Sequence, residues 1–321
     1  MLMLLSHLPP FASQHGDGEG IVGRFGDPIL DAAYIADYKS IQLFLREIRE
    51  EQEEGVMGNK KKKDVNAVDT EGRNALHLCG LDPQDERLIV DDCCRRIALM
   101  LNSEGTNLSA TEKNGLNAVH YGATKGFPTF VSFLCRKGNV PCDQKDAEGR
   151  TPLLKAVAHG FNDTFHALYE LGADVNVKDS EGLSILHYAV RLVANEKEDV
   201  FLPFLEELLK LNLMSLDVKD NEGRTPLMYA ALNNHLKMVS KLLDYGADPR
   251  IQDVYEITAA RMSKNREIFA ILAEAVANYT LKEHEKWMQQ QQQELDNFPE
   301  EEGEEVDFEK LLRDNPSIDE F

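Results

Sequence analysis

Three glycines near the start of the chain have the spacing of a dinucleotide-binding loop. Gly18, Gly20 and Gly23 match the pattern G-x-G-x-x-G, in which glycines let a pyrophosphate approach the backbone at the start of a helix. That chemistry requires a buried strand before the glycines and a helix after them. The flanking residues here are polar, and Asp27-Pro28 stands where the helix should run. We therefore predict that residues 1–26 are a flexible leader, and we expect no cofactor.

Cysteine side chains could supply a nucleophile or metal ligands, but their placement favours structural roles. Cys79 falls on the first helix of a predicted helix pair and Cys135 on a second helix, so we interpret both as small buried apolar side chains. Cys93 and Cys94 follow two aspartates, whose negative charge disfavours a reactive thiolate. The sequence contains no GxxxxGK[ST], HExxH, GxSxG or paired CxxC motif. It therefore indicates neither an enzyme nor a metal site.

Composition narrows the class of protein further. The 321 residues are 42% hydrophobic and 28% charged, which is typical of soluble globular chains. The formal net charge of -21 disfavours nucleic acid as a partner, because a phosphate binder needs a basic face. No apolar run approaches the roughly 18 residues of a membrane span. Five cysteines are an odd number and form no secreted disulfide framework, so we expect a reducing compartment.

Basic and acidic runs bear on location. Lys60 to Lys63 could act as a nuclear import signal, or could be a solvated loop. The sequence predicts a cytoplasmic protein, with the nucleus as the alternative. Residues 296–321 carry eleven Asp and Glu against Lys310 and Arg313, a net charge of -9. We expect residues 298–321 to be a disordered acidic tail.

Internal repetition decides the organisation of the rest of the chain. Similar segments begin with DTEGRNALHLCG at Asp69, and a degenerate copy, DVYEITAARMSK, begins at Asp253. Between them lie EKNGLNAVHYGA, DAEGRTPLLKAV, DSEGLSILHYAV and DNEGRTPLMYAA. Successive starts are separated by 43, 34, 33, 41 and 33 residues. The two long spacings indicate insertions near 82–92 and 194–200, which should lengthen the link between two helices or extend the second helix.

Each copy reads as a turn followed by two helices. In Asp-x-x-Gly the aspartate can bond the backbone two residues on, and glycine takes the position of positive φ. Thr151-Pro152 is a polar N-cap with proline at the first helical position. Leu153 and Val157 then follow at helical spacing, and a second apolar helix ends at Gly172. A unit of this kind cannot bury its apolar face alone, so copies must stack on one another.

These units resemble ankyrin repeats, whose signature is Thr-Pro-Leu-His-x-Ala after Asp-x-x-Gly. His77, His120 and His187 keep the histidine of the signature. The resemblance covers roughly residues 27–277. It implies an all-α ankyrin-repeat solenoid of about six to seven repeats, degenerate caps included. It also implies that the histidines brace turns through backbone bonds and bind no metal.

The repeat pattern also sets the domain boundaries. We predict a leader at 1–26, an ankyrin-repeat domain at 27–277, a polar helical extension at 278–297 and the acidic tail at 298–321. Residues 28–48 read as an N-terminal capping repeat without its turn.

In the ankyrin family a partner binds the concave face, which the turn tips and the exposed side of each first helix form. Mapping these positions by motif selects basic and polar residues, although glutamates lie beside several of them and the face could instead be of mixed charge. The predicted partner-binding residues are Lys113, Lys125, Lys145, Arg150, His159, Lys178, Arg191, Lys219, Arg224, Asn233 and Tyr255.

Two functions are compatible with such a face. The first is a non-catalytic adaptor or scaffold that binds a protein partner, with the C-terminal helix and tail as a second interaction element. The alternative is a regulatory subunit of a kinase, phosphatase or ubiquitin ligase, whose activity would lie in the partner. Neither function requires a small-molecule substrate or membrane insertion.

Overall fold

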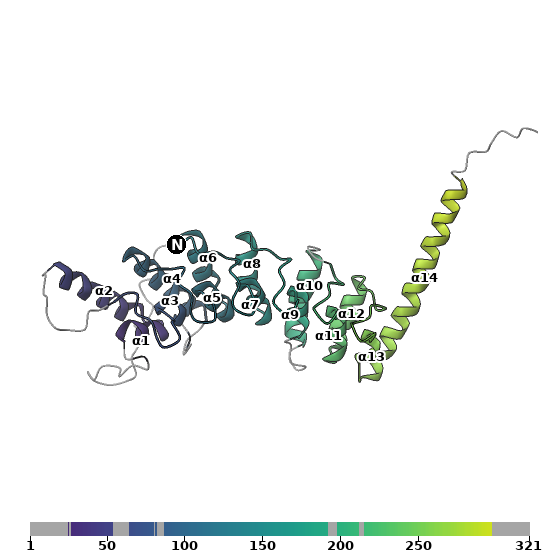
Figure 1. Ribbon diagram of the computed structural model, residues 1–321, viewed down its shortest axis with the longest axis horizontal. Coiled ribbons are helices and arrows are strands. Elements are labelled where there is room, and N and C mark those ends of the chain that lie inside the picture. The colour runs from purple at the N-terminus through teal and green to yellow at the C-terminus, as the bar shows by residue number, and fades with distance from the viewer. Residues whose placement is uncertain are drawn as a thin grey trace, which may run out of the picture.

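The computed structural model describes residues 25, 27–53, 64–79, 81, 87–191, 198–211 and 215–296. These residues form fourteen helices, with two isolated β-bridges and no longer strand among them. Consecutive helices pair, and the pairs stack side by side in an elongated row (Figure 1). The predicted all-α solenoid is confirmed. The helices are α1 (Pro28–Tyr34), α2 (Tyr38–Glu53), α3 (Ala75–Leu78), α4 (Arg87–Ser103), α5 (Ala118–Lys125), α6 (Pro128–Arg136), α7 (Pro152–Ala158), α8 (Asn162–Glu170), α9 (Ile185–Arg191), α10 (Glu198–Lys210), α11 (Pro226–Leu232), α12 (Leu236–Asp244), α13 (Ala259–Met262) and α14 (Arg266–Asp296).

The first helices of the pairs form one layer and the second helices form another. α5, α7, α9 and α11 pack in series, as do α4 with α6 and α6 with α8. One continuous apolar core lies between the layers, and it includes the fully buried Phe130, Leu153 and Phe165. Stacking gives each short helix two neighbours, which supplies the burial that an isolated pair lacks.

A tight turn precedes each first helix from α3 onward, and we call this turn the tip. The tip before α5 begins with Glu112 and the other tips begin with an aspartate. The aspartate accepts hydrogen bonds from the backbone N–H groups two and four residues on, as Asp179 does from Glu181 (2.9 Å) and Leu183 (2.8 Å). Gly182 adopts φ of 81°, a region that costs other residues about 1–2 kcal/mol. The predicted turn chemistry is confirmed, and the same pattern recurs at Asp69, Asp146, Asp220 and Asp253.

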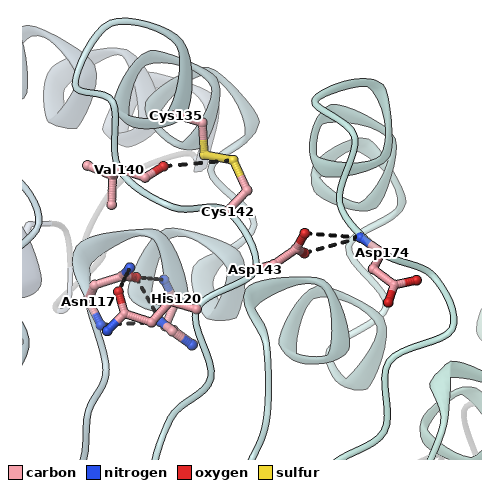
Figure 2. Close-up of a disulfide and its surroundings, with 8 residues drawn as sticks. Asn117, His120, Cys135, Val140, Cys142, Asp143 and Asp174 are labelled. Atoms are coloured by element: carbon pink, nitrogen blue, oxygen red, sulfur yellow. Dashed lines mark hydrogen bonds between the residues drawn. A yellow bond between two sulfur atoms is a disulfide. The ribbon is translucent and has the colours of Figure 1, made fainter.

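The three signature histidines connect neighbouring repeats. The backbone N–H of Asn117 donates to Nδ1 of His120 at 3.2 Å (Figure 2). Nε2 of His120 lies 3.2 Å from the carbonyl oxygen of Arg150 in the next tip. His77 reaches Leu116 in the same way, and His187 reaches Arg224. The predicted bracing role is therefore confirmed.

Both predicted insertions coincide with longer second helices. α4 has 17 residues and α10 has 13, whereas α6, α8 and α12 have nine each. Residues 82–86 and 192–197, which precede the two long helices, lie outside the described residues.

The extended α4 makes a contact that skips one repeat. Arg87, at the start of α4, places its guanidinium 5.1 Å from the ring centroid of Phe161 and 3.4 Å from a carboxylate oxygen of Asp163 at the start of α8. Phe161 and Arg87 both lie over Gly126, where an added Cβ would meet the Phe161 ring at 2.5 Å. Repeats here therefore contact second neighbours, a feature that the repeat pattern does not predict.

The C-terminal helix α14 is continuous from Arg266 to Asp296, so the boundary drawn at residue 277 falls inside it. Ile268 and Leu272 are buried, and Arg250 binds Glu283 with Nη2 at 2.9 Å and lies 4.3 Å from the Tyr279 ring centroid. Residues 280–293 are exposed, and α14 projects away from the row (Figure 1). The predicted leader at 1–26 lies outside the described residues except Phe25, and the acidic tail at 298–321 lies outside them entirely.

The cysteine interpretation is confirmed in part and wrong in part. Cys79, Cys93 and Cys94 are buried thiols, and burial raises the pKa of Cys93 to about 11. Cys135 is half-buried and forms a disulfide with Cys142 (Figure 2). Asn139, at φ of 52°, turns the chain back after α6 and brings the two Cα atoms to 6.0 Å. Sequence spacing alone did not reveal this local reversal.

The last tip departs from the others at two positions. Glu256 holds φ of 60° where glycine stands in the other tips, a conformation that is strained for glutamate. In addition, Oδ2 of Asp253 is buried and has no hydrogen bond. In the preceding repeat, Tyr229 donates to the corresponding oxygen of Asp220, whereas Met262 occupies the equivalent position here. The tip that begins at Asp253 is therefore the least stable of the described tips.

Replacing Glu256 with glycine should stabilise this unit by about 0.5–1 kcal/mol. Glycine removes the strain of the positive φ, and the greater conformational entropy of glycine in the unfolded chain cancels only part of that gain. In the parent, amides at 257–270 should exchange with solvent faster than those at 152–170, and Glu256→Gly should slow them. Glu222→Gly is the matched control, because Glu222 has no positive φ. Equal protection of the two segments in the parent would contradict the prediction.

Candidate protein-binding surface

Consecutive tips are joined to one another by backbone hydrogen bonds. At each of five junctions an N–H of one tip donates to a carbonyl oxygen of the preceding tip, over 2.8–3.1 Å. We call the surface formed by these tips and the exposed side of the first helices the inner face. The five bonds run from Lys113 to Glu71, Ala147 to Asn114, Ser180 to Glu148, Asn221 to Glu181 and Val254 to Glu222. The ladder fixes tip side chains from different repeats in register.

The predicted arginines of the inner face are paired with glutamates of their own tips. Arg191 binds Glu181 at 2.7 Å and Arg224 binds Glu222 at 2.5 Å, while Arg150 binds both Glu148 and Asp146. Because of these same glutamates, the sequence was also compatible with an inner face of mixed charge. Neighbouring carboxylates therefore neutralise the three arginines, and this part of the inner face carries both positive and negative side chains.

Three of the predicted lysines form a separate row, each one residue before a tip aspartate (Asp146, Asp179 or Asp220). Nζ of Lys145 donates to the carbonyl of Lys178 at 3.2 Å, Nζ of Lys178 to that of Lys219 at 2.8 Å, and Nζ of Lys219 to that of Gln252 at 3.3 Å. All three side chains belong to exposed residues. Lys113 lies one repeat earlier and is 3.8 Å from a carboxylate oxygen of Glu71.

The remaining predicted residues are spread along the inner face. Asn233 donates to the carbonyl of Arg191 at 3.1 Å, which links α11 to α9, and Tyr255 is 66% exposed at the last tip. Lys125 is bound to the carbonyl of Leu81 at 3.1 Å. His159 lies just beyond the end of α7, stacked on Phe161. The structure thus brings the lysine row, Arg150 and Arg224 together at the tips, whereas Lys125, His159, Arg191 and Asn233 lie at the C-terminal ends of their helices.

Three polar side chains of the inner face were missed by sequence reasoning. Tyr188 donates to Asp179 and Tyr229 to Asp220, both at 2.7 Å, and Lys155 lies 3.1 Å from Asp146. Burial and the bond to Asp220 raise the pKa of Tyr229 to about 12, and burial lowers the pKa of Lys155. Each of the three lies nine residues after its aspartate, a repeated spacing that could have revealed them.

Comparison with known families agrees with this geometry. A family model for ankyrin repeats, in three copies, matches residues 91–179 and 171–253, which together span about half of the chain. This chain belongs to the ankyrin-repeat family. Ankyrin repeats are generally protein-interaction modules, which is consistent with the exposed polar groups of the inner face.

Similar ankyrin-repeat proteins differ widely in what surrounds their repeats. The chain is 31% identical over 143 residues to the transient receptor potential cation channel subfamily A member 1 of Drosophila melanogaster, covering 44% of this chain and 12% of that one. It is 28% identical over 181 residues to the nuclear factor NF-kappa-B p105 subunit of Gallus gallus, covering 56% and 17%. It is also 35% identical over 101 residues to palmitoyltransferase Hip14 of Drosophila melanogaster, covering 32% and 15%. The likeness is thus confined to a small part of each relative.

A solved ankyrin-repeat structure has the same fold. The ankyrin repeat domain of Bcl-3 superposes with a TM-score of 0.56 at 21% identity, covering 80% of this chain and all of that domain. Within the described residues of this ankyrin-repeat chain, no group of His, Cys, Asp and Glu could hold a metal ion. No helix in that part of the chain has the length and apolar character needed to cross a bilayer.

Proposed function

We propose that this ankyrin-repeat chain is a non-catalytic adaptor that binds a protein partner through its inner face. The observation that carries the proposal is the ladder of bonds between tips, which places exposed lysines, paired arginines and Tyr255 on one surface shared by successive repeats. Fixed side chains lose little conformational freedom when a partner binds, which favours specific recognition. The predicted residues Lys145, Lys178, Lys219 and Arg224 would contact the partner.

Charge reversal on the inner face tests this proposal. The full-length variant with Lys178, Arg191, Lys219 and Arg224 all replaced by glutamate should lose its partner in a pull-down read by mass spectrometry. Its circular dichroism spectrum should match that of the parent, because three of the four side chains are exposed, Arg224 is half-buried, and charges at such positions affect association more than folding. The matched control reverses the exposed Lys137, Lys210, Lys264 and Lys286, which changes the net charge equally. Retention of the same proteins by the inner-face variant would show that the partner binds elsewhere.

The same experiment separates an adaptor from a regulatory subunit. A regulatory subunit requires a kinase, phosphatase or ligase subunit to co-purify stoichiometrically, whereas an adaptor does not. We further propose a cytoplasmic location, with the nucleus as the alternative, in spite of the Cys135–Cys142 disulfide, a bond that is uncommon in both reducing compartments. The lysine run at 60–63 that motivates the alternative lies outside the described residues. Imaging of the tagged chain before and after substitution of this run tests the location.

A further inference from the structure

The lysine row, defined by Lys145, Lys178 and Lys219, is held in place by the backbone. Each ammonium group donates one hydrogen bond to the carbonyl oxygen of the next residue in the row, or of Gln252 at its end. An ammonium group has three N–H donors, so two on each lysine stay available. The row is therefore a fixed line of cations with unused hydrogen-bonding capacity.

The carboxylates that could neutralise this row are already engaged. Glu181 binds Arg191 and Glu222 binds Arg224, while Asp179 and Asp220 accept from tyrosines and from backbone N–H groups. Over the described ranges, none of the three lysines lies within ion-pair distance of an acidic side chain. The row thus keeps three positive charges on a protein whose net charge is -21.

The spacing of the row restricts the shape of a complementary anion. Packed helices lie about 8–10 Å apart, so neighbouring lysines in the row are separated by about that distance. A polyproline II segment rises about 3.1 Å per residue with three residues per turn. It therefore presents every third side chain on one side, at intervals of about 9 Å. A β-strand would turn every third side chain to the opposite face.

The width of the surface favours the same shape. The arginine–glutamate pairs lie beside the lysine row, since Glu148 is three residues from Lys145 and Arg150 is five. An α-helix, about 10–12 Å wide, would cover both rows and press its own carboxylates against these glutamates. A polyproline II segment is narrower and can lie along the lysines alone.

We propose that the lysine row binds an acidic protein segment in the polyproline II conformation, with a carboxylate at every third residue. The inference rests on the proposed function of the inner face and adds the charge, spacing and shape of what binds there. Seven residues of such a segment suffice to place three carboxylates on the three lysines.

Register-matched peptides test the proposal on the full-length chain. The probe is a fluorescent nine-residue peptide, Pro-Glu-Pro-Pro-Glu-Pro-Pro-Glu-Pro, measured by anisotropy at low ionic strength. A second peptide has the same composition but three consecutive glutamates. Because single exposed ion pairs are weak, three in register should bind about tenfold tighter than the out-of-register peptide. The variant K145Q/K178Q/K219Q should abolish that difference, whereas K137Q/K210Q/K264Q, with the same loss of charge, should keep it.

Four results would overturn the proposal. Three of them are equal binding of the two peptides, an unchanged preference in K145Q/K178Q/K219Q, and equally tight binding of a nine-nucleotide oligothymidylate, which would indicate general attraction to polyanions. A helical peptide with glutamate at every seventh residue that binds more tightly than the probe would also overturn it. Failure of the proposed function looks different: the partner then survives the inner-face charge reversal in the pull-down, whatever the peptides do.

Discussion

At pH 5 the folded protein should be about 4 kcal/mol less stable to denaturant than at pH 7, because two buried histidines must stay neutral. Burial lowers the pKa of His77 to about 4 and that of His120 to about 4, from an unfolded value of 6.5. Between these two values the unfolded chain binds protons that the folded chain does not. Stability is therefore complete above about pH 6.5 and is lost as the pH falls towards 4, by about 2 kcal/mol for each histidine at pH 5.

The geometry explains why the protonated form is excluded. Nδ1 of His120 accepts a hydrogen bond from the backbone N–H of Asn117, and a proton on Nδ1 would exchange this bond for one to Oδ1 of Asn117, 2.7 Å away. The ring is fully buried, so the cation would also lose its hydration. Burial lowers the pKa of His187 as well, in the same direction.

Urea unfolding at pH 7 and pH 5 measures this difference. His120→Leu should reduce it by about half, because one of the two histidines is removed. Leucine should fit the site, since Leu154 occupies the same position in the repeat that begins at Asp146. His77→Leu should reduce the difference equally. Because His77 lies in another repeat, the test still works if one of the two variants fails to fold. If both variants keep the full difference between the two pH values, the histidines are not its source.

Leu153→Ala should lower the free energy of unfolding by about 2–5 kcal/mol. Leu153 is fully buried in α7, which packs against both α5 and α9. The lost side chain would leave a cavity in the middle of the stack, where neighbouring repeats cannot collapse without moving apart. Leu227, which is 1% exposed in α11, should respond in the same way.

A more exposed leucine in α11 serves as the control for this substitution. Leu232→Ala removes the same atoms from a side chain that is 48% exposed, and it should cost less than about 1 kcal/mol. Urea midpoints at constant m-value measure all three variants. A loss at Leu153 no larger than that at Leu232 would refute the burial argument.

The features of this fold that were predictable from sequence are those set by local chemistry. The Asp-x-x-Gly tips and the Thr151-Pro152 cap depend on residues a few positions apart, so the repeat pattern predicted them correctly. The histidine braces join neighbouring repeats, and the resemblance to ankyrin repeats implied them. The longer second helices at α4 and α10 were predictable for a related reason, since extra residues in a stacked unit must lengthen one of its parts.

Features that depend on how individual side chains and loops are placed in the fold were not predictable. Motif mapping selected Arg150, Arg191 and Arg224 as basic groups, but only the folded tips show that glutamates neutralise them. The contact of Arg87 with Phe161 and the Cys135–Cys142 disulfide depend on how individual loops turn. Sequence spacing does not encode those turns, because one repeat period is compatible with many loop paths.

The histidine braces give the array a direction. Each histidine donates from Nε2 towards the C-terminal neighbour, never towards the N-terminal one, in all three described cases. Truncation that removes the next repeat would leave the Nε2–H of a buried ring without an acceptor, whereas removal of a preceding repeat would free only a carbonyl oxygen that water can reach. The repeat that contains Leu154, and those that begin at Asp220 and Asp253, carry no such histidine. Shortened chains that end at one of these repeats should therefore tolerate the cut better than chains that end at His77, His120 or His187.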